Sequence, residues 1–167
     1  MPAVEMHTAH IYKEKLLLVI GGRALPQGAK LEDIQFSDII YQIDLEDGTV
    51  SEFGRLPSAI GSHVSLIVDD KYLVLYGGTN GFRFFDNILR YSIADQRWML
   101  MTKQPEGLQG HPFLQDGRIA SSACQVGNSY GVVFGGCSAM QDESGFLILP
   151  FSHVRVDENF SEINEIM

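Results

Sequence analysis

The sequence predicts an all-β protein built from three copies of one four-stranded unit. The first observation is that three apolar runs, LLLVIGG, LVLYGG and GVVFGG, each end in two glycines. The second is that the first glycines of these pairs are spaced 56 and 58 residues apart, which is typical of a repeat architecture. The third is that a polar turn lies at the same distance before each glycine pair, so the hairpin that ends at the glycines has the same length in all three units. The glycine pairs are Gly21 and Gly22, Gly77 and Gly78, and Gly135 and Gly136.

The order of β-rich runs is the same in each unit. Upstream of the glycines we expect two strands joined by a tight turn: HTAHIY-KEK-LLLVI, HVSLIV-DDK-YLVLY and SSACQV-GNS-YGVVF. His7, His63 and Ser121 each begin such a hairpin, 14 residues before the first glycine of the pair. Downstream, after a loop of variable length, we expect a second hairpin: DIIYQIDLEDGTVSEF, NILRYSIADQRWMLM and SHVRVDENFSEINEI. Asp, Asn and Gly in the turns EDG, ADQ and DEN favour tight turns, so each unit has four antiparallel strands, a to d.

The runs LLLVI and LVLY are apolar at every position, which indicates strands that are covered on both faces. A repeat of roughly 50 residues that forms four strands and needs neighbours on both sides is typical of one blade of a β-propeller. The sequence therefore predicts one repeat region over 1–167, with approximate blades at 5–54, 55–104 and 112–167. The glycines would take positive φ, or allow close backbone approach, where the chain leaves strand b.

An apolar run, Gly-Gly, a variable loop, a Tyr-containing strand and then Trp resemble the kelch repeat. The second unit carries the pattern through Gly77, Gly78, Tyr91 and Trp98. The first unit departs from it, since Val50 stands where Trp is usual, although Asp44 and the GRLP ending at Pro57 match. The third unit has Asp157 but only Phe160 or Ile163 in place of Trp. The resemblance implies a kelch-type β-propeller segment.

Three blades do not close a propeller, because closed rings need roughly four to eight. Each blade relies on its neighbours to cover its apolar faces, so three blades leave two end faces open. Two arrangements are sensible. Either the chain is part of a larger propeller, which we favour, or two chains join as three plus three blades in a six-bladed assembly. The expected partners therefore include the remaining blades of the same propeller or a second copy of the chain.

Composition narrows the function classes. The 167 residues are 45% apolar and carry a net charge of −9, which is typical of a globular protein. No basic stripe offsets the negative charge, so nucleic acid is not an expected partner. No apolar run reaches the roughly 18 to 20 residues of a membrane helix, and MPAVEMHTAHIYKEK lacks the features of a secretory leader. We therefore expect no membrane partner and a cytoplasmic or nuclear location.

Residues that bind metals or act as nucleophiles do not form a recognised motif. Cys124 and Cys137 lie too far apart on the predicted hairpin for a disulfide, and we expect both to be buried, reduced thiols. His7 and His10, three apart on a strand, face opposite sides and are interpreted as structural. Ser121, Ser122 and Cys124 sit on a strand without a nucleophile elbow. We predict no metal, no cofactor and no catalytic residue.

The resemblance leaves other functions open. Some kelch-like propellers are enzymes, and some proteins attach a regulatory kelch region to a serine/threonine phosphatase domain. The Glu-x-x-x-Asp-x-x-x-His pattern of iron-binding nitrile-forming proteins does not occur in this sequence. A regulatory region of a larger enzyme is therefore the alternative to a noncatalytic scaffold, and a mutarotase-like sugar enzyme is a third.

The variable loops are the predicted binding surface. In a four-stranded blade the b to c and d to a connections emerge at the same end, and a rigid frame with variable loops is how repeat proteins present recognition residues. The resemblance to kelch adaptors implies that this end binds a protein or a neighbouring domain through arginine, polar and aromatic contacts. The loop FRFF should point at least one aromatic side chain outwards. The expected partner-binding residues are Arg23, Arg55, Asn80, Phe82, Arg83, Phe84 and His111.

Overall fold

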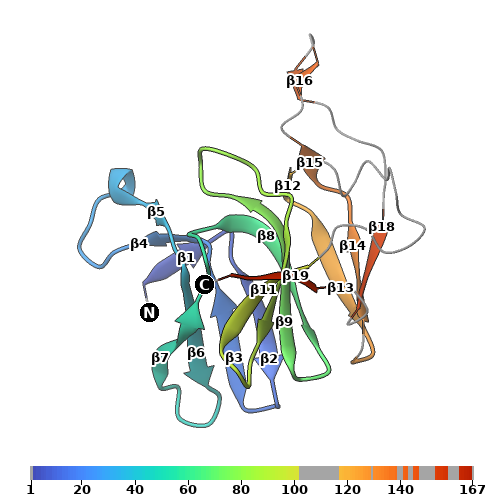
Figure 1. Ribbon diagram of the computed structural model, residues 1–167. Coiled ribbons are helices and arrows are strands. Elements are labelled where there is room, and N and C mark those ends of the chain that lie inside the picture. Colours follow the sequence, from blue (N-terminus) through green and yellow to red (C-terminus); the bar gives the residue numbers. More distant parts are fainter. Residues whose placement is uncertain are drawn as a thin grey trace.

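A computed structural model of the chain describes residues 2–101, 117–128 and 130–138 and four further strand segments at 141–142, 145–146, 153–157 and 162–166. Its regular structure is almost entirely antiparallel β-sheet (Figure 1). The one helix among the described residues is a short 3-10 turn, η1 (Leu31–Asp33). The all-β prediction is confirmed.

The predicted strands form, and the sheets follow the predicted units closely. The first sheet runs in the order β2 (Thr8–Tyr12), β3 (Leu16–Ile20), β6 (Ile39–Asp44) and β7 (Val50–Arg55). The second sheet contains β8 (Gly61–Val68), β9 (Tyr72–Thr79), β10 (Ile88–Ser92) and β11 (Arg97–Met101) in the same order. The third sheet contains β13 (Ser122–Val126), β14 (Tyr130–Phe134) and β18 (His153–Asp157).

The fourth strand of the third unit is a correction to the prediction. We expected SEINEI to pair with SHVRV as the second hairpin of that unit. Instead β19 (Glu162–Ile166) pairs with β11, where Ile166 lies opposite Trp98, so the second sheet has five strands and the third has three. An exposed edge strand offers unpaired backbone groups to any strand within reach, and β11 would be such an edge without β19.

The hairpin between strands a and b is built in the same way in the first two units. In the first two units both central turn residues have positive φ, which is the geometry of a type I′ turn and matches the twist of the strands that it joins. Lys15 N and Lys71 N close these turns on the carbonyls of Tyr12 and Val68 at 3.2 and 3.0 Å. The left-handed residues are Lys13, Glu14, Asp69 and Asp70 in the first two turns and Gly127 in the third.

The glycine pairs take positive φ in all three units, as predicted, with values of 57° to 71° at the first glycine and 87° to 92° at the second. Close approach also requires them. A Cβ at Gly21 would lie 2.6 Å from the carbonyl oxygen of Ile60, and a Cβ at Gly77 would collide with the carbonyl of Arg118. Ile60 and Arg118 occupy the same place in successive units, just before strand a. The first glycine of a pair therefore packs against the backbone that enters the next sheet.

Hydrogen bonds between successive units repeat as well. Ser62 N donates to the carbonyl of Met6 at 2.8 Å, and Ala120 N donates to the carbonyl of Ser62 at 3.1 Å. These three residues occupy equivalent positions and share positive φ values of 54° to 57°, which is uncommon for residues other than glycine. One contact between neighbouring sheets thus occurs twice in the described chain.

Two apolar clusters hold the sheets together. The cluster between the first and second sheets includes Leu18, Ile20, Leu73, Leu75 and Trp98. The cluster between the second and third sheets includes Val64, Leu66, Val74, Tyr76 and Val133. The second sheet is therefore buried on both faces, as its continuous apolar runs predict.

The longer connections lie at one end of the sheets, at the top of Figure 1, and the tight hairpin turns lie at the other. The connection after β3 was expected to be a plain loop, but it forms a small sheet of β1 (Ala3–Glu5), β4 (Arg23–Leu25) and β5 (Gln35–Phe36). After the third glycine pair, β15 (Cys137–Ser138) pairs with β12 (Arg118–Ile119), and β16 (Gln141–Asp142) pairs with β17 (Gly145–Phe146). These additions give the loop end short strands of its own.

The prediction of buried thiols is wrong. Cys124 is exposed and Cys137 is half-buried, and both are free thiols as expected. Cys124 lies on the face of the third sheet that points away from the second sheet, so no apolar cluster covers it. Within the described ranges, no helix is long and apolar enough to cross a membrane.

Candidate functional site

The connection between β9 and β10, residues 79–87, is held by its own polar side chains. Thr79 Oγ1 donates to the carbonyl of Arg83 at 2.8 Å and accepts from Gly81 N at 3.0 Å. Asn80 Oδ1 accepts from the backbone N of Phe82 at 3.0 Å and of Arg83 at 3.1 Å. Asn80 was predicted to contact a partner, and the structure gives its carbonyl group a role in fixing the loop. A loop fixed in this way presents its outward side chains with little entropy left to lose.

The FRFF stretch points its side chains in different directions. Phe82 is 96% exposed, so at least one aromatic side chain points outwards, as expected. Phe85 is buried, and the guanidinium of Arg83 lies over its ring with 4.6 Å between Cζ and the ring centroid. Phe84 is half-buried and bridges back to Thr79 across the loop. Of these four residues, only Phe82 and Arg83 are exposed.

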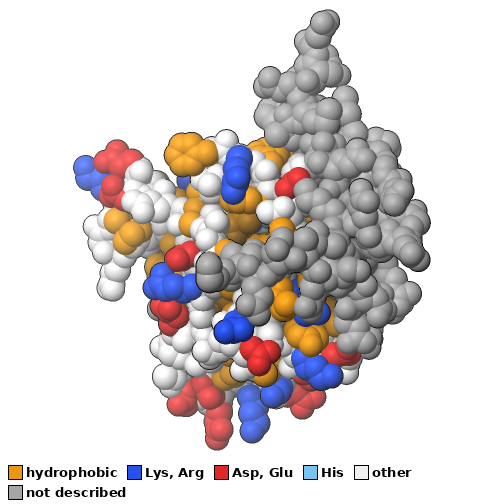
Figure 2. All heavy atoms as spheres, viewed as in Figure 1, with side chains coloured by type: hydrophobic (Ala, Val, Ile, Leu, Met, Phe, Trp, Pro, Cys, Tyr) orange, Lys and Arg blue, Asp and Glu red, His pale blue; other side chains and the backbone are white. Residues whose placement is uncertain are grey.

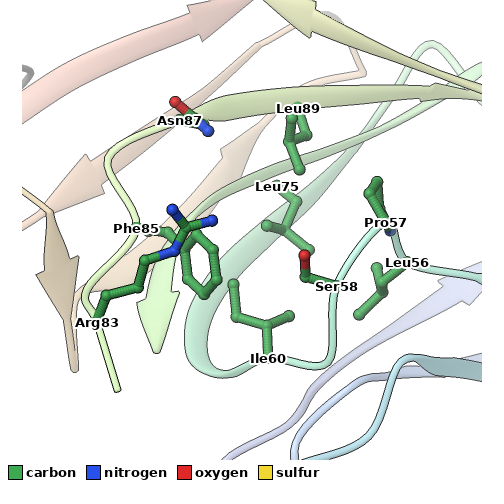
Figure 3. A pocket seen from close by; sticks show the side chains of 10 residues that line it. Leu56, Pro57, Ser58, Ile60, Leu75, Arg83, Phe85, Asn87 and Leu89 are labelled. Atoms are coloured by element: carbon green, nitrogen blue, oxygen red, sulfur yellow. The ribbon is translucent and has the colours of Figure 1, made fainter. Parts of the chain in front are cut away.

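A cavity of about 230 Å³ opens beside Arg83 (Figure 3). One wall comes from the connection that links the first sheet to the second, and the other comes from the second sheet and its 79–87 loop. The lining is mostly aliphatic, with the Arg83–Phe85 pair on one side and the Asn87 amide at the rim (Figure 3). The lining side chains are those of Leu56, Pro57, Ser58, Ile60, Leu75, Arg83, Phe85, Asn87 and Leu89.

The size of this cavity limits what it can hold. Pockets for drug-sized ligands and cofactors are roughly 300–1,000 Å³, so this one is better suited to one or two amino-acid side chains. Its single cationic side chain, Arg83, lies over an aromatic ring, which leaves the edge of the guanidinium available for a carboxylate. The site can therefore accept an apolar side chain with an acidic group next to it.

Arg23 lies on the neighbouring loop rather than in this cavity. Its guanidinium is 5.9 Å from the ring centroid of Phe36 and 3.2 Å from a carboxylate oxygen of Glu5. A Cβ on Gly81 would lie 3.1 Å from the Phe36 ring, so Phe36 joins the loop that carries Arg23 to the loop that carries Phe82. The structure thus brings Arg23, Phe82 and Arg83 to adjacent loops at one end.

Arg55 is already occupied by two carboxylates. Its guanidinium donates to Glu52 at 2.9 and 3.0 Å and to Asp38 at 3.1 and 3.2 Å. The hydrogen bonds to Glu52, followed by those to Asp38, raise the pKa of Arg55. A partner would have to compete with two existing ion pairs. Arg55 is therefore the weakest of the predicted arginines, and His111 lies outside the described residues.

Figure 2 shows hydrophobic side chains next to a basic one at the loop end, at the top of the view, and charged side chains of both signs at both ends of the molecule. An exposed apolar surface beside a cation is typical of a protein-binding site.

No protein-family model and no curated protein matches this chain. The kelch resemblance thus rests on the residues quoted above, and the site has to be interpreted from its own geometry.

A second polar group lies between the first and second sheets. Thr8 Oγ1 is 3.0 Å from His63 Nε2, and His10 Nε2 is 2.8 Å from the hydroxyl of Ser65. The Ser65–His10 contact has the geometry of a nucleophile and base, but Ser65 is buried between two sheets where no substrate can reach it. The described residues contain no group of three or more His, Cys, Asp or Glu side chains that could hold a metal ion. We therefore assign this group to the packing of the two sheets.

This group makes stability depend on pH. Burial, and then the neighbouring His10 and His7, lower the pKa of His63 to about 4, and burial also lowers the pKa of His10. Between pH 6.5 and 4 the unfolded chain binds a proton at His63 that the folded chain excludes, so the free energy of unfolding falls as pH falls through this window. His63 alone should account for roughly 3 kcal/mol of this loss.

Urea unfolding at a series of pH values between about 7 and 5 measures the effect with little contribution from carboxylates. The variant His63→Gln should show a shallower decline, with the remainder due to His10 and the other titrating groups. An equal slope in the variant and the wild type would exclude His63 as the main titrating group.

Sequence reasoning missed the walls of the cavity. Leu56, Pro57 and Ile60 belong to the connection GRLPSAIG, which we placed on the predicted binding surface but from which we chose only Arg55. The available signal was the presence of three apolar residues in a connecting loop, where polar residues are usual. Phe36 could not be found in this way, because its role depends on contact with Gly81 of the next unit.

Proposed function

We propose that the chain is a noncatalytic, kelch-type propeller segment that binds a protein partner through its loop end. The observation that carries the proposal is a fully exposed phenylalanine, Phe82, held on a rigid loop beside the Arg83–Phe85 stack and the apolar cavity. Aromatic and arginine side chains beside a small pocket are typical of the residues that dominate binding energy in protein interfaces.

The propeller part of the proposal is supported by the repeated contact between sheets. The same glycine-to-carbonyl approach and the same backbone hydrogen bond join the first sheet to the second and the second to the third. Blades that contact only their nearest neighbours through one repeated interface are what a propeller requires. The five-stranded second sheet departs from this pattern at β19.

The proposed partner presents a short segment with an aliphatic or aromatic side chain next to Asp or Glu. The apolar side chain enters the cavity between Leu56, Ile60 and Leu89, which line it with aliphatic groups. The carboxylate pairs with the guanidinium of Arg83, whose position over Phe85 is already set before binding. Phe82 packs against the partner outside the cavity.

Selection from a random linear peptide library displayed on phage tests this proposal. Enriched peptides should contain an acidic residue beside an apolar one. Arg83→Ala should weaken the binding of a selected peptide by about tenfold or more, and Phe82→Ala should have a similar effect, because both groups are exposed and positioned before binding. Titration calorimetry gives the affinities, and the melting temperature should change little in either variant.

Arg97→Ala is the matched control, since Arg97 is an exposed arginine at the start of β11, at the hairpin end of the second sheet. The affinity of the peptide should be unchanged in this variant. Selected peptides that lack acidic residues, together with equal affinity for the wild type and Arg83→Ala, would contradict the proposal.

A further inference from the structure

The first sheet packs on the second, and the second packs on the third, through the same kind of interface. Each such interface joins two different sheet faces, which we call its two halves. The half that the second sheet presents to the first is formed by residues at alternate positions of its strands, and all of them are buried or nearly so. They are Ile67, Leu73, Leu75, Tyr91 and Trp98. The half that the second sheet presents to the third is formed by its opposite face. It includes Val64, Leu66, Val68, Val74 and Tyr76, together with Ile88 and Met101.

The face of the first sheet that points away from the second sheet, its outer face, carries residues equivalent to those that the second sheet presents to the first. The equivalent residues in strand order are Ile11, Leu17, Val19, Ile43 and Val50. Ile11 is 55% exposed and Val50 is 40% exposed, although Ile67 and Trp98 at the same positions of the second sheet are buried. All five side chains are apolar and none is charged, in a chain of net charge −9. This face is therefore built for burial but lies in solvent at its margins.

The face of the third sheet that points away from the second sheet, its outer face, carries residues equivalent to those that the second sheet presents to the third. The equivalent residues on its first two strands are Ser122, Cys124, Val126, Val132 and Phe134. On the third strand Arg155 lies opposite Val132, as Arg90 lies opposite Val74 in the second sheet. Val126 is 38% exposed and Cys124 is exposed, whereas Val68 and Leu66 at the same positions are buried. A Cβ on Gly135 would meet no atom within 4 Å, whereas its equivalents Gly21 and Gly77 each press on the backbone of the following sheet.

We propose that the outer face of the third sheet in one copy of the chain packs on the outer face of the first sheet in a second copy. Each copy carries both halves of the interface, so two copies can cover all four faces with one kind of contact used twice. This is the three-plus-three arrangement, the alternative to the larger propeller that we favour from the sequence alone. Val4 of the second copy, which is equivalent to Ile60 and Arg118, would lie next to Gly135. The contact repeats an interface that the chain already forms twice, and it does not depend on the loop end, so binding of a partner and self-association are tested separately.

Sedimentation equilibrium of the wild-type chain, from about 1 to 300 μM, should give a mass that reaches twice that of the chain and does not rise further. Ile11→Lys and Val126→Lys should each raise the Kd of the dimer by about 100-fold or more, because each places an unpaired charge in an apolar contact. Cys124→Lys repeats the test at a second position of the third sheet. Leu31→Lys is the control, since Leu31 is exposed and lies on η1, outside both faces.

Mixing the two variants tests which faces meet. Each variant alone damages both contacts of its dimer, whereas a mixed pair of Ile11→Lys and Val126→Lys chains keeps one contact between two unchanged faces. The mixture should therefore recover part of the dimer that each variant lacks. A wild-type chain that stays monomeric, a mass that rises past the dimer, loss of dimer in Leu31→Lys or no recovery on mixing would each overturn the proposal. Circular dichroism should show that all variants fold.

Discussion

Trp98→Ala should lower the free energy of unfolding by about 3–5 kcal/mol, the range for removing a buried aromatic side chain. Trp98 is buried between the first and second sheets and stacks on Tyr91 with 4.9 Å between ring centroids. Its indole Nε1 donates to the carbonyl of Arg55 at 2.6 Å, so truncation also leaves a carbonyl at this contact without its donor. Urea unfolding followed by circular dichroism measures the loss.

Trp98→Phe separates the two contributions. It keeps an aromatic side chain against Tyr91 but removes the indole donor, so we expect a loss of about 1–3 kcal/mol, smaller than that of Trp98→Ala. A Trp98→Ala variant as stable as the wild type would show that the first and second sheets do not pack through this residue. It would also show that Trp98, which matches the Trp of the kelch pattern, does not contribute to the core.

Gly77→Ala should be comparably destabilising, by roughly 3 kcal/mol. The left-handed backbone of Gly77, with φ of 71°, costs an alanine about 1–2 kcal/mol. The added methyl group also collides with the carbonyl of Arg118, and moving the backbone of the next sheet adds about 1–3 kcal/mol. The midpoint of thermal unfolding and the urea midpoint should both fall.

Gly48→Ala is the matched control for this substitution. Gly48 lies in the turn between β6 and β7 with φ of 74°, and a Cβ there would meet no atom within 4 Å. Only the backbone cost remains, so the loss should be about 1 kcal/mol. Equal losses at the two positions would mean that Gly77 serves its own turn and not the contact between sheets.

The repeat itself could be predicted because local signals and long-range packing agree. The glycine pairs need positive φ wherever strand b ends, and the I′ turns need a fixed hairpin length, so both leave a mark in the sequence. Trp98 could be placed in the core for the same reason, since it stands at the repeated position opposite Tyr91. These features depend on residues that are close in the chain.

Features that depend on other units could not be predicted. The EINEI run has the composition of a strand, but nothing in it specifies β11 rather than β18 as its neighbour. Cys124 was expected to be buried because it lies on an inner strand, yet its burial depends on a sheet that would have to pack on the third one. The cavity beside Arg83 likewise joins a connection from one unit to a loop of the next.

Binding of a partner at the loop end stays a prediction, and the structure shows only how the side chains of its FRFF loop lie. FRFF was chosen for its composition, and the structure separates its members into the exposed Phe82 and Arg83, the half-buried Phe84 and the buried Phe85. Side chains alternate between two faces along a strand, but not in a turn such as the one that Asn80 holds. The sequence therefore could not show which ring points outwards.

The most direct test of the proposed binding site is an amide chemical-shift map of the isotope-labelled chain with a peptide selected on it. Binding at the loop end predicts that the largest shifts fall at residues 58–60, 77 and 82–85, around the cavity and the exposed loop. Shifts concentrated at residues 13–15 and 69–71, in the hairpin turns at the opposite end, would contradict it.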